Sequence, residues 1–464
     1  MERDDLVKTH KQYKLNDKKW DFFIRSYYGG FDYKMGGYLT KYVLERDDEY
    51  EDRLANTAID NHCRNIVQVY SSFLFRIPPT REFGSLVNDQ ALDSFLRDAD
   101  LDGRSFDSIM KEAQVYSSVY GHCWMLLDKP SVEARTRAEE LGMEIRPYLS
   151  IFTPENIYDW KFDRMMNGRY ELSYLKIRES YDDEFAYFKI WTRESIKTYK
   201  LPIDDDKGTL VEEMPNPLGK IPAVVLYNQR SPERGVGISD LSDVAEMQKA
   251  IYNELSEIEQ LIRISNHPSL VKTPNVQASA GAGSVVQIPE DLNPALKPYQ
   301  LQPSGANLEA IMKSINTKIE SIDRMTHMGS VRATATGVQS GVALETEFQL
   351  LNARLSEKGD LLELAEEQLW TFWAMWQDRE FDGEIKYPDS FNLRDWTSDL
   401  QYLMTAKASG IRSSTFQQEI DKQIVSQVID DDEVINTIHQ EIEQNATVGD
   451  FGLTEPEPAT IPEV

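Results

Sequence analysis

The feature that most constrains the fold is a long run of apolar residues at helical spacing in the last third of the sequence. Steps of three, four and seven residues separate its members, which are Leu344, Phe348, Leu351, Leu355, Leu362, Ala365, Leu369, Phe372 and Trp376. Lys358 interrupts the pattern. The spacing predicts one helix of about 35 residues, roughly 50 Å long at ~1.5 Å per residue, with Gly359 as a candidate bend.

Two shorter amphipathic helices precede this segment and enclose a small insert. Ser239 fits an N-cap for the first helix, whose apolar side is Leu241, Val244, Ile251, Leu255, Ile258 and Ile262. The second helix places Leu308, Ile311, Ile315, Ile319 and Ile322 on one side. The insert, about 266–304, is rich in Pro, Gly, Ala and Ser. After the second helix, the small and nearly uncharged residues 329–341 predict a mobile loop.

The remaining segments predict an α+β fold that is mainly helical. In the first hundred residues, helical spacing from Ala55 to Phe73 predicts a helix that ends before Pro78, and a second helix is expected over 107–119. Aromatic and β-branched runs separated by turn residues then predict an antiparallel sheet, with strands near 122–128, 148–152, 170–177, 185–191, 196–201 and 223–227. Residues 399–444 are again expected to be helical, and 446–464 disordered.

Charge and cysteine content narrow the function classes. The 464 residues carry a formal net charge of −28, so a basic DNA-gripping surface is not expected. Such a chain could still let DNA slide past without holding it. Two cysteines argue against a disulfide scaffold and favour a reducing cytosol. No stretch is apolar enough for a membrane span, and the N-terminus lacks the apolar core of a secretory signal.

Residues 98–103 begin like a calcium-binding EF-hand loop. The twelfth position, which requires a bidentate glutamate, is Ile109, so a turn followed by a helix N-cap is expected instead. The pairs His62-Cys63 and His122-Cys123 could offer four zinc ligands, but neither pair has zinc-ligand spacing. Two buried structural cysteines are therefore expected.

The sequence gives no sign of an enzyme. No phosphate loop, serine elbow or zinc-protease motif is present, and the acidic triplets 204–206 and 430–432 fit turn and linker roles. Three tryptophans at the end of the long helix, Trp370, Trp373 and Trp376, are expected in a core or a subunit interface. We therefore expect no catalytic residue, cofactor or metal, although a carbohydrate-active enzyme with two cleft carboxylates stays open as an alternative.

Four stretches together resemble the portal protein family of tailed bacteriophages. They are residues 74–79, residues 99–106 with 120–130, residues 154–160, and residues 219–224 leading to Ser239-Asp240-Leu241. None of them is specific alone. Their order is more telling, because an α/β region, a helix, an insert, a second helix, a loop and a very long helix follow one another as in portals. The resemblance covers about 40–445, and an acidic cellular scaffold with a coiled-coil-like helix is the alternative.

The resemblance implies a portal-type architecture with wing, stem, clip and crown. Residues 1–237 and 342–395 would form the wing, 238–264 and 306–327 the stem, 265–305 the clip, 328–341 the tunnel loop and 396–445 the crown. It also implies a homo-oligomeric ring of about twelve subunits at the capsid portal vertex, made in the host cytoplasm and free of membrane. Its implied partners are double-stranded DNA, the terminase large subunit, a head-completion adaptor, and the major capsid and scaffolding proteins.

The resemblance also implies two sets of site residues. The DNA channel would be lined by Arg332, Thr334, Thr336 and Gln339 of the tunnel loop and by Lys313, Lys318 and Arg324 of the second stem helix. For the three stem residues, solvent exposure or pairing with Glu309 and Glu320 is the alternative. Partner binding through the clip would use Lys272, Asn275, Gln277, Gln287, Lys297 and Tyr299.

Overall fold

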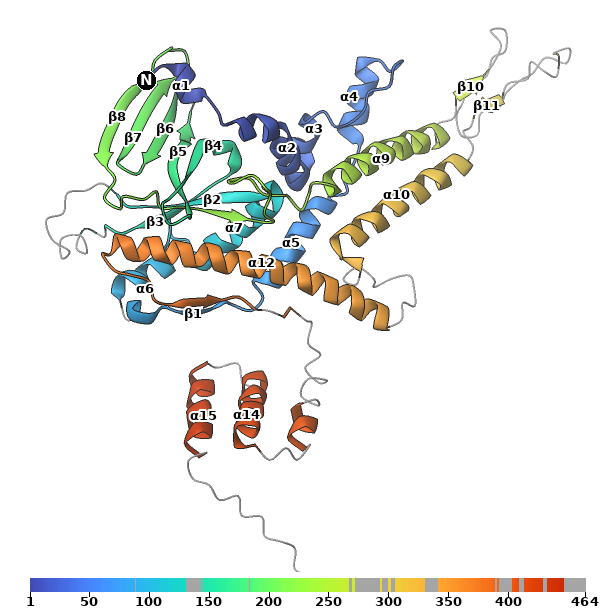
Figure 1. Ribbon diagram of the computed structural model, residues 1–464. Helices are drawn as coiled ribbons and strands as arrows, with labels where there is room; N and C mark the ends of the chain where they lie inside the picture. The colour runs from blue at the N-terminus through green and yellow to red at the C-terminus, as the bar shows by residue number, and fades with distance from the viewer. Residues whose placement is uncertain are drawn as a thin grey trace, which may run out of the picture. The chain divides into compact units, whose positions relative to one another are not determined.

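The computed structural model divides into two compact units, Met1–Phe391 and Asn392–Val464. It describes residues 1–87, 89–130, 143, 145–182, 184–266, 269–271, 293, 299–301, 305–329, 341–388, 390–391, 403–408, 413–428 and 432–445. Figure 1 shows the element order, which confirms the α+β class. No helix in the described residues is both long and apolar enough to cross a bilayer.

The N-terminal third of the first unit is helical. Its helices are α1 (Arg3–Val7), α2 (Lys11–Tyr28), α3 (Gly30–Met35), α4 (Asp47–Asn56), α5 (His62–Leu74), α6 (Gln90–Arg97) and α7 (Phe106–Tyr120). The predicted single helix across Ala55–Phe73 was wrong. The chain leaves helical geometry at Thr57, and Asn61 starts α5 anew by accepting a hydrogen bond from the Arg64 N–H. The expected turn at 98–103 leads to Ser105, which caps α7.

The β region contains two antiparallel sheets rather than the single sheet predicted. One sheet has the order β3-β2-β9, from β2 (His122–Asp128), β3 (Tyr148–Phe152) and β9 (Ala223–Tyr227). The other is the meander β4 (Ile157–Arg164), β5 (Tyr170–Tyr181), β6 (Phe185–Thr192), β7 (Ser195–Pro202) and β8 (Thr209–Pro215). Strands β4 and β8 were not predicted. All seven residues of β2 are buried, as expected for the central strand of its sheet.

The long helix α12 (Gly341–Trp376) has 36 residues and confirms the strongest sequence prediction. It is continuous through Gly359, where an added Cβ would lie 3.6 Å from the Cβ of Tyr387. Leu362, Leu369, Trp370 and Trp373 pack with α6, α7 and β2 in one core, and Leu351 and Leu355 join a second core with α5 and α7. After α12 the chain returns as β12 (Glu384–Lys386), which pairs with β1 (Thr80–Glu82).

The second unit is helical in its described residues. A short helix over 403–408 is followed by α14 (Ser414–Val428) and α15 (Asp432–Asn445), and α14 lies against α15. The predicted helices of 399–444 are confirmed for the residues that the structure describes. The prediction for 446–464 lies outside the described residues.

Candidate channel helices

Two helices of the first unit, α9 (Val244–Asn266) and α10 (Gly305–Thr326), run side by side in opposite directions (Figure 1). Beyond their ends, β10 (Ser269–Val271) and β11 (Tyr299–Leu301) pair antiparallel. A coiled coil would continue its heptads through this segment, so the strands argue against the scaffold alternative. Ile251, Ile315 and Ile322 pack with α5 and α12 in one core, so this part of the apolar stripes read from the sequence faces the core, whereas Ile262 is 40% exposed.

A charged contact also joins the two helices. Lys318 Nζ lies 2.6 Å from Glu254 Oε1, and the hydroxyl of Ser314 donates to the same oxygen at 2.8 Å. The expected partners of Lys318 were Glu309 and Glu320 on its own helix, and that pairing was wrong. Lys318 lies on the side of α10 that faces α9, because it follows Ser314 by one helical turn.

The other two stem residues are exposed. Arg324 donates to the hydroxyl of Ser321 at 3.1 Å, and the Lys313 ammonium has no partner among the described residues. Neither forms an ion pair with Glu309 or Glu320 within the part of the chain that the structure describes. Of the predicted stem cations, these two are therefore available to a ligand.

A buried charged cluster holds the root of α9, and we call Asp240, Arg354, Lys358, Asn228 and Ser118 the stem anchor. The Asp240 carboxylate accepts from Lys358 Nζ at 2.7 Å, from Arg354 Nη2 at 3.0 Å and from Asn228 Nδ2 at 3.0 Å. Lys358 also donates to Asn228 Oδ1 and to the Ser118 hydroxyl. The side chains of Asp240 and Lys358 are 4% and 3% exposed. The anchor thus ties α9 to α12, α7 and β9.

The electrostatics of the anchor follow from its burial. Burial alone would raise the pKa of the Asp240 carboxyl, but Lys358 and Arg354 outweigh that effect and hold the pKa below its ordinary value. Burial lowers the pKa of the Lys358 ammonium, against the opposing pull of Asp240. The anchor also explains why α9 begins at Val244, later than expected. Ser239 caps a turn, accepting from Leu241 N at 2.9 Å, and that turn points Asp240 inward.

A close backbone approach lies beside the anchor. Gly121, which ends α7 with φ +92°, faces Gly237, and a Cβ on Gly121 would lie 2.6 Å from the Gly237 carbonyl oxygen. Only glycine allows both the left-handed conformation and the contact. The segment that leads into α9 is therefore held against the end of α7 by backbone as well as by charge.

The predicted tunnel-loop residues Arg332, Thr334, Thr336 and Gln339 lie outside the described residues, between the end of α10 and the start of α12. The predicted clip residues Lys272, Asn275, Gln277, Gln287 and Lys297, which lie between α9 and α10 in the sequence, are also outside the described residues. Tyr299 begins β11, where its backbone pairs with Val271.

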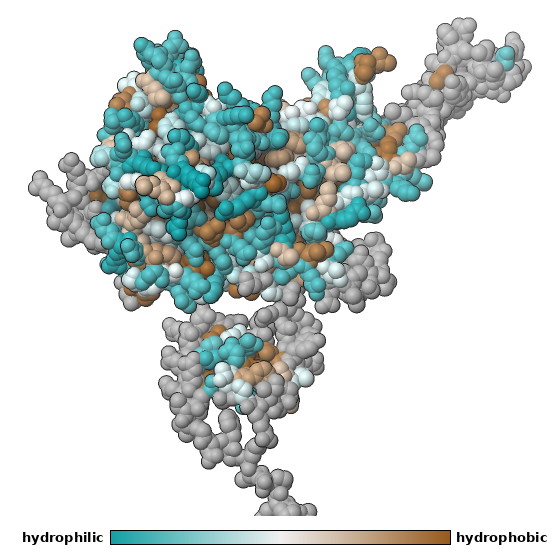
Figure 2. Space-filling view, viewed as in Figure 1, coloured by the Kyte–Doolittle hydropathy of each residue, from teal (hydrophilic) through white to brown (hydrophobic). Residues whose placement is uncertain are grey.

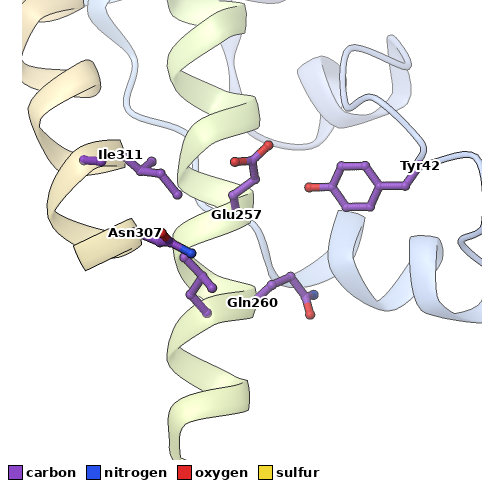
Figure 3. A pocket seen from close by; sticks show the side chains of 7 residues that line it. Tyr42, Glu257, Gln260, Asn307 and Ile311 are labelled. Atoms are coloured by element: carbon purple, nitrogen blue, oxygen red, sulfur yellow. The ribbon is translucent and has the colours of Figure 1, made fainter. Parts of the chain in front are cut away.

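Sequence reasoning missed a groove on the outer side of the helix pair. Its volume is about 460 Å³, and its lining comes from three segments: Tyr42, then Glu257, Gln260 and Leu261 of α9, then Asn307, Ala310 and Ile311 of α10 (Figure 3). Tyr42 lies more than 200 residues before α9 in the sequence, so no local pattern could have indicated the groove. Glu257 is its one charged residue, which gives no acid–base pair.

The cysteines, histidine, aspartate and tryptophans considered as other candidate sites are buried or take part in local structure. Burial raises the pKa of both cysteine thiols and lowers the pKa of His122 to about 3. Asp98 accepts from the Gly103 N–H at 2.9 Å and pairs with Arg146, so its carboxylate serves the turn. The described residues contain no group of three or more His, Cys, Asp or Glu side chains placed to hold a metal ion. Trp370 and Trp373 are 1% exposed and belong to the core.

A protruding helix pair, a buried anchor at its root and the long helix α12 are the main features of the helical part of the first unit. The model of one family, described as "Phage portal protein, SPP1 Gp6-like", matches residues 11–447, and the chain belongs to this family. It is therefore a portal-type structural protein of the virion, at the head-to-tail connection. No curated protein matches it.

Among solved structures, the chain is similar to proteins of gene transfer agent (GTA) particles. The neck of the native particle computed with C12 symmetry aligns with 11% identity and a TM-score of 0.44, over 86% of this chain and 98% of that chain. The neck of the empty particle computed with C6 symmetry aligns with 10% identity and a TM-score of 0.42, over 85% and 99%.

Proposed function

We propose that this chain assembles into a closed ring of about twelve subunits through which double-stranded DNA enters and leaves the capsid. One observation carries the proposal beyond family membership. The outer parts of α9 and α10 leave apolar side chains uncovered, with Ile262 40% and Met312 52% exposed, although the root of α9 is fixed by the buried anchor. A wall of such pairs around an axis would cover this surface with neighbouring copies.

In the proposed ring, α9 and α10 are the stem, 238–264 and 306–327. The segment 265–305 is the clip, 328–341 the tunnel loop, 396–445 the crown, and residues 1–237 with 342–395 the wing. The clip, through Lys272, Asn275, Gln277, Gln287, Lys297 and Tyr299, would meet the terminase large subunit during packaging and a head-completion adaptor afterwards. The wing would meet the major capsid and scaffolding proteins. The chain supplies no catalysis, and ATP-driven work belongs to the terminase.

The charge of the chain supports sliding rather than gripping. With a net charge of −28 per subunit, the channel as a whole repels phosphate, so few counterions are released on contact and the duplex meets no deep binding minimum. Local cations would supply the transient contacts. We assign these to Arg332 with Thr334, Thr336 and Gln339 of the tunnel loop, and to the exposed Lys313 and Arg324. Lys318 contributes less, because Glu254 holds its ammonium.

The DNA contact is tested by Arg332→Glu in the phage. We expect genome packaging or retention to fall while portal rings still form, because the loop lies outside the helix pair. Arg97→Glu, at an exposed residue of α6 outside the loop, is the charge-matched control and should package normally. Full packaging by Arg332→Glu would contradict the assignment of this residue.

The ring itself is tested by negative-stain microscopy of the purified protein across a range of concentrations. We expect annular particles with a central hole and a single subunit number. A homogeneous assembly without a hole, such as a compact dimer, would contradict the proposal.

A further inference from the structure

The segment before α4 displays two aliphatic side chains at nearly full exposure. Val43 is 99% exposed and Leu44 is 94% exposed. Figure 2 shows hydrophobic atoms gathered at the loop that leads into α4. Burying a side chain of this size is worth roughly 1.5–3 kcal/mol, so a folded chain gains nothing by holding two of them in water.

A buried network holds this loop in place. The Arg53 guanidinium, 2% exposed, donates to both carboxylate oxygens of Glu45 at 2.7 Å, to the Thr40 carbonyl at 2.6 Å and to the Ser256 hydroxyl of α9 at 2.9 Å. The Tyr42 N–H donates to Glu45 at 3.0 Å, and the guanidinium lies 4.2 Å from the centre of the Tyr42 ring. Residues on both sides of Val43 and Leu44 are therefore held by hydrogen bonds, and the fold displays the two side chains between them.

Acidic residues follow the two aliphatic side chains. Residues 45–52 contain six acids and one arginine, Arg46. Arg46 is shared by Asp48 and Glu49, each at 3.2 Å, and Glu51 is exposed without a partner among the described residues. We call Val43, Leu44, Asp48 and Glu51 the acidic corner.

A surface of the opposite charge lies on α2. Residues 8–19 contain five lysines and one acid, Asp17. All five lysines are exposed, and within the described part of the chain none of their ammonium groups forms an ion pair or hydrogen bond. Lys11, Lys14 and Lys18 are spaced at three and four residues and lie opposite the buried Trp20 and Phe23.

An aliphatic side chain lies at the centre of these lysines. Leu15 is 58% exposed, and Lys11, Lys18 and Lys19 are its neighbours one turn away on the helix. We call Leu15 with Lys11, Lys18 and Lys19 the lysine face. An apolar centre with a charged rim is the anatomy of a protein interface, and a phosphate backbone offers no counterpart to Leu15.

We propose that the acidic corner of one copy docks on the lysine face of α2 in the next copy. The proposal rests on the ring proposed above and names one of its contacts. Subunits of net charge −28 repel one another, so assembly needs complementary charge where copies meet. The two surfaces differ and lie on separate elements of one unit, so each copy can offer one surface to each of two neighbours, as a ring requires.

The test is a charge swap read out by mass photometry of the full chain. Lys11→Glu with Lys18→Glu is expected to raise the concentration at half-assembly by about tenfold or more, because attraction becomes repulsion. Asp48→Lys with Glu51→Lys is expected to do the same. The four changes together should restore assembly. Glu49 is left unchanged because it accepts from the Arg46 N–H at the start of α4.

Arg97→Glu with Lys111→Glu is the matched control for the lysine variant, since both residues are exposed, lie on neither surface and give the same change in net charge as Lys11→Glu with Lys18→Glu. It should assemble like the wild type, and circular dichroism should show every variant folded. A further variant, Leu44→Ser, should weaken assembly without altering the charge.

The outcomes separate this contact from the ring. If the wild type forms rings and both the lysine variant and the acidic-corner variant assemble like it, the proposed contact is wrong and the ring proposal is unaffected. Loss of assembly in both variants, without recovery when the four changes are combined, would also contradict the contact. Loss of binding to a 40-base-pair duplex by the lysine variant, with normal assembly, would make the lysine face a nucleic-acid surface and overturn the contact. Wild-type open chains that need both surfaces would support the contact and contradict the closed ring. A wild type that stays monomeric would contradict both.

Discussion

The long helix α12 and the pair α9–α10 have similar sequence patterns but different surroundings. In α12 the apolar stripe is covered within the subunit, and Leu351, Leu355, Leu362 and Leu369 are at most 2% exposed. In the pair, the stripe is covered near the anchor and open further out, where Ile262 is 40% exposed. Helical periodicity thus indicates that a face will be covered without indicating by what. The difference supports the proposal that other copies cover the open part of α9–α10.

The largest effect should come from the covered helix. Trp370 is 1% exposed, and its indole N–H donates to Glu366 at 3.0 Å. Trp370→Ala is expected to lower the free energy of unfolding by about 3–5 kcal/mol, whereas Met312→Ala on α10 should change it by less than about 0.5 kcal/mol. Urea denaturation of dilute, monomeric protein measures both, and equal effects would break the contrast between the two regions.

The stem anchor joins the two regions and should come next. Lys358→Met leaves the buried Asp240 with Arg354 as its remaining cation, and is expected to lower the free energy of unfolding by about 3 kcal/mol. Lys161, whose side chain is 68% exposed, supplies the control Lys161→Met, expected within about 0.5 kcal/mol of wild type. If Lys358→Met unfolds like this control, the anchor does not stabilise the fold.

Acid should weaken the fold through the buried His122. Burial lowers the pKa of His122 in β2 from 6.5 to about 3, so the folded state holds this imidazole neutral. Below pH 6.5 the imidazole takes up a proton only when the chain unfolds. The free energy of unfolding therefore falls as the pH drops, by about 1.4 kcal/mol per pH unit, until the pH reaches about 3.

His122→Gln should remove this share of the pH dependence. The measurement is the free energy of unfolding of both proteins at pH 7 and pH 5, and a constant difference between them across that range would show that the imidazole does not titrate on unfolding.

The smallest effect on the isolated subunit is expected at the open end of the pair. Ile262→Ser should change the free energy of unfolding by less than about 1 kcal/mol, because the side chain is already 40% exposed. It should nevertheless raise the concentration at half-assembly seen by mass photometry. Unchanged assembly would mean that neighbouring copies do not cover this surface.

Local patterns predicted much of the fold. The period of α12, the N-cap of α7 and the bounds of β9 follow from short-range spacing and turn residues. Strand β8 was missed because its exposed side chains give no buried alternation, and β4 because it starts directly after a helical turn at Pro154. The division into two sheets depends on long-range pairing, because β9 joins β2 across 97 to 105 residues.

The site was less predictable for the same reason. Lys358 was visible as a break in the α12 pattern, but its partner Asp240 lies 118 residues away. Lys318 was expected to find a carboxylate on its own helix, and the nearer one belonged to the facing helix. Charge spacing along one helix ranks partners within that helix and says nothing of a helix that packs against it.

The central claim is that the α9–α10 pairs of several copies enclose an axis. A cryo-electron microscopy reconstruction of the assembled protein tests it most directly. We expect both helices at the wall of a central opening wide enough for duplex DNA, with Ile262 and Met312 covered by the adjacent copies. A closed assembly in which these helices point outward into solvent would contradict the account.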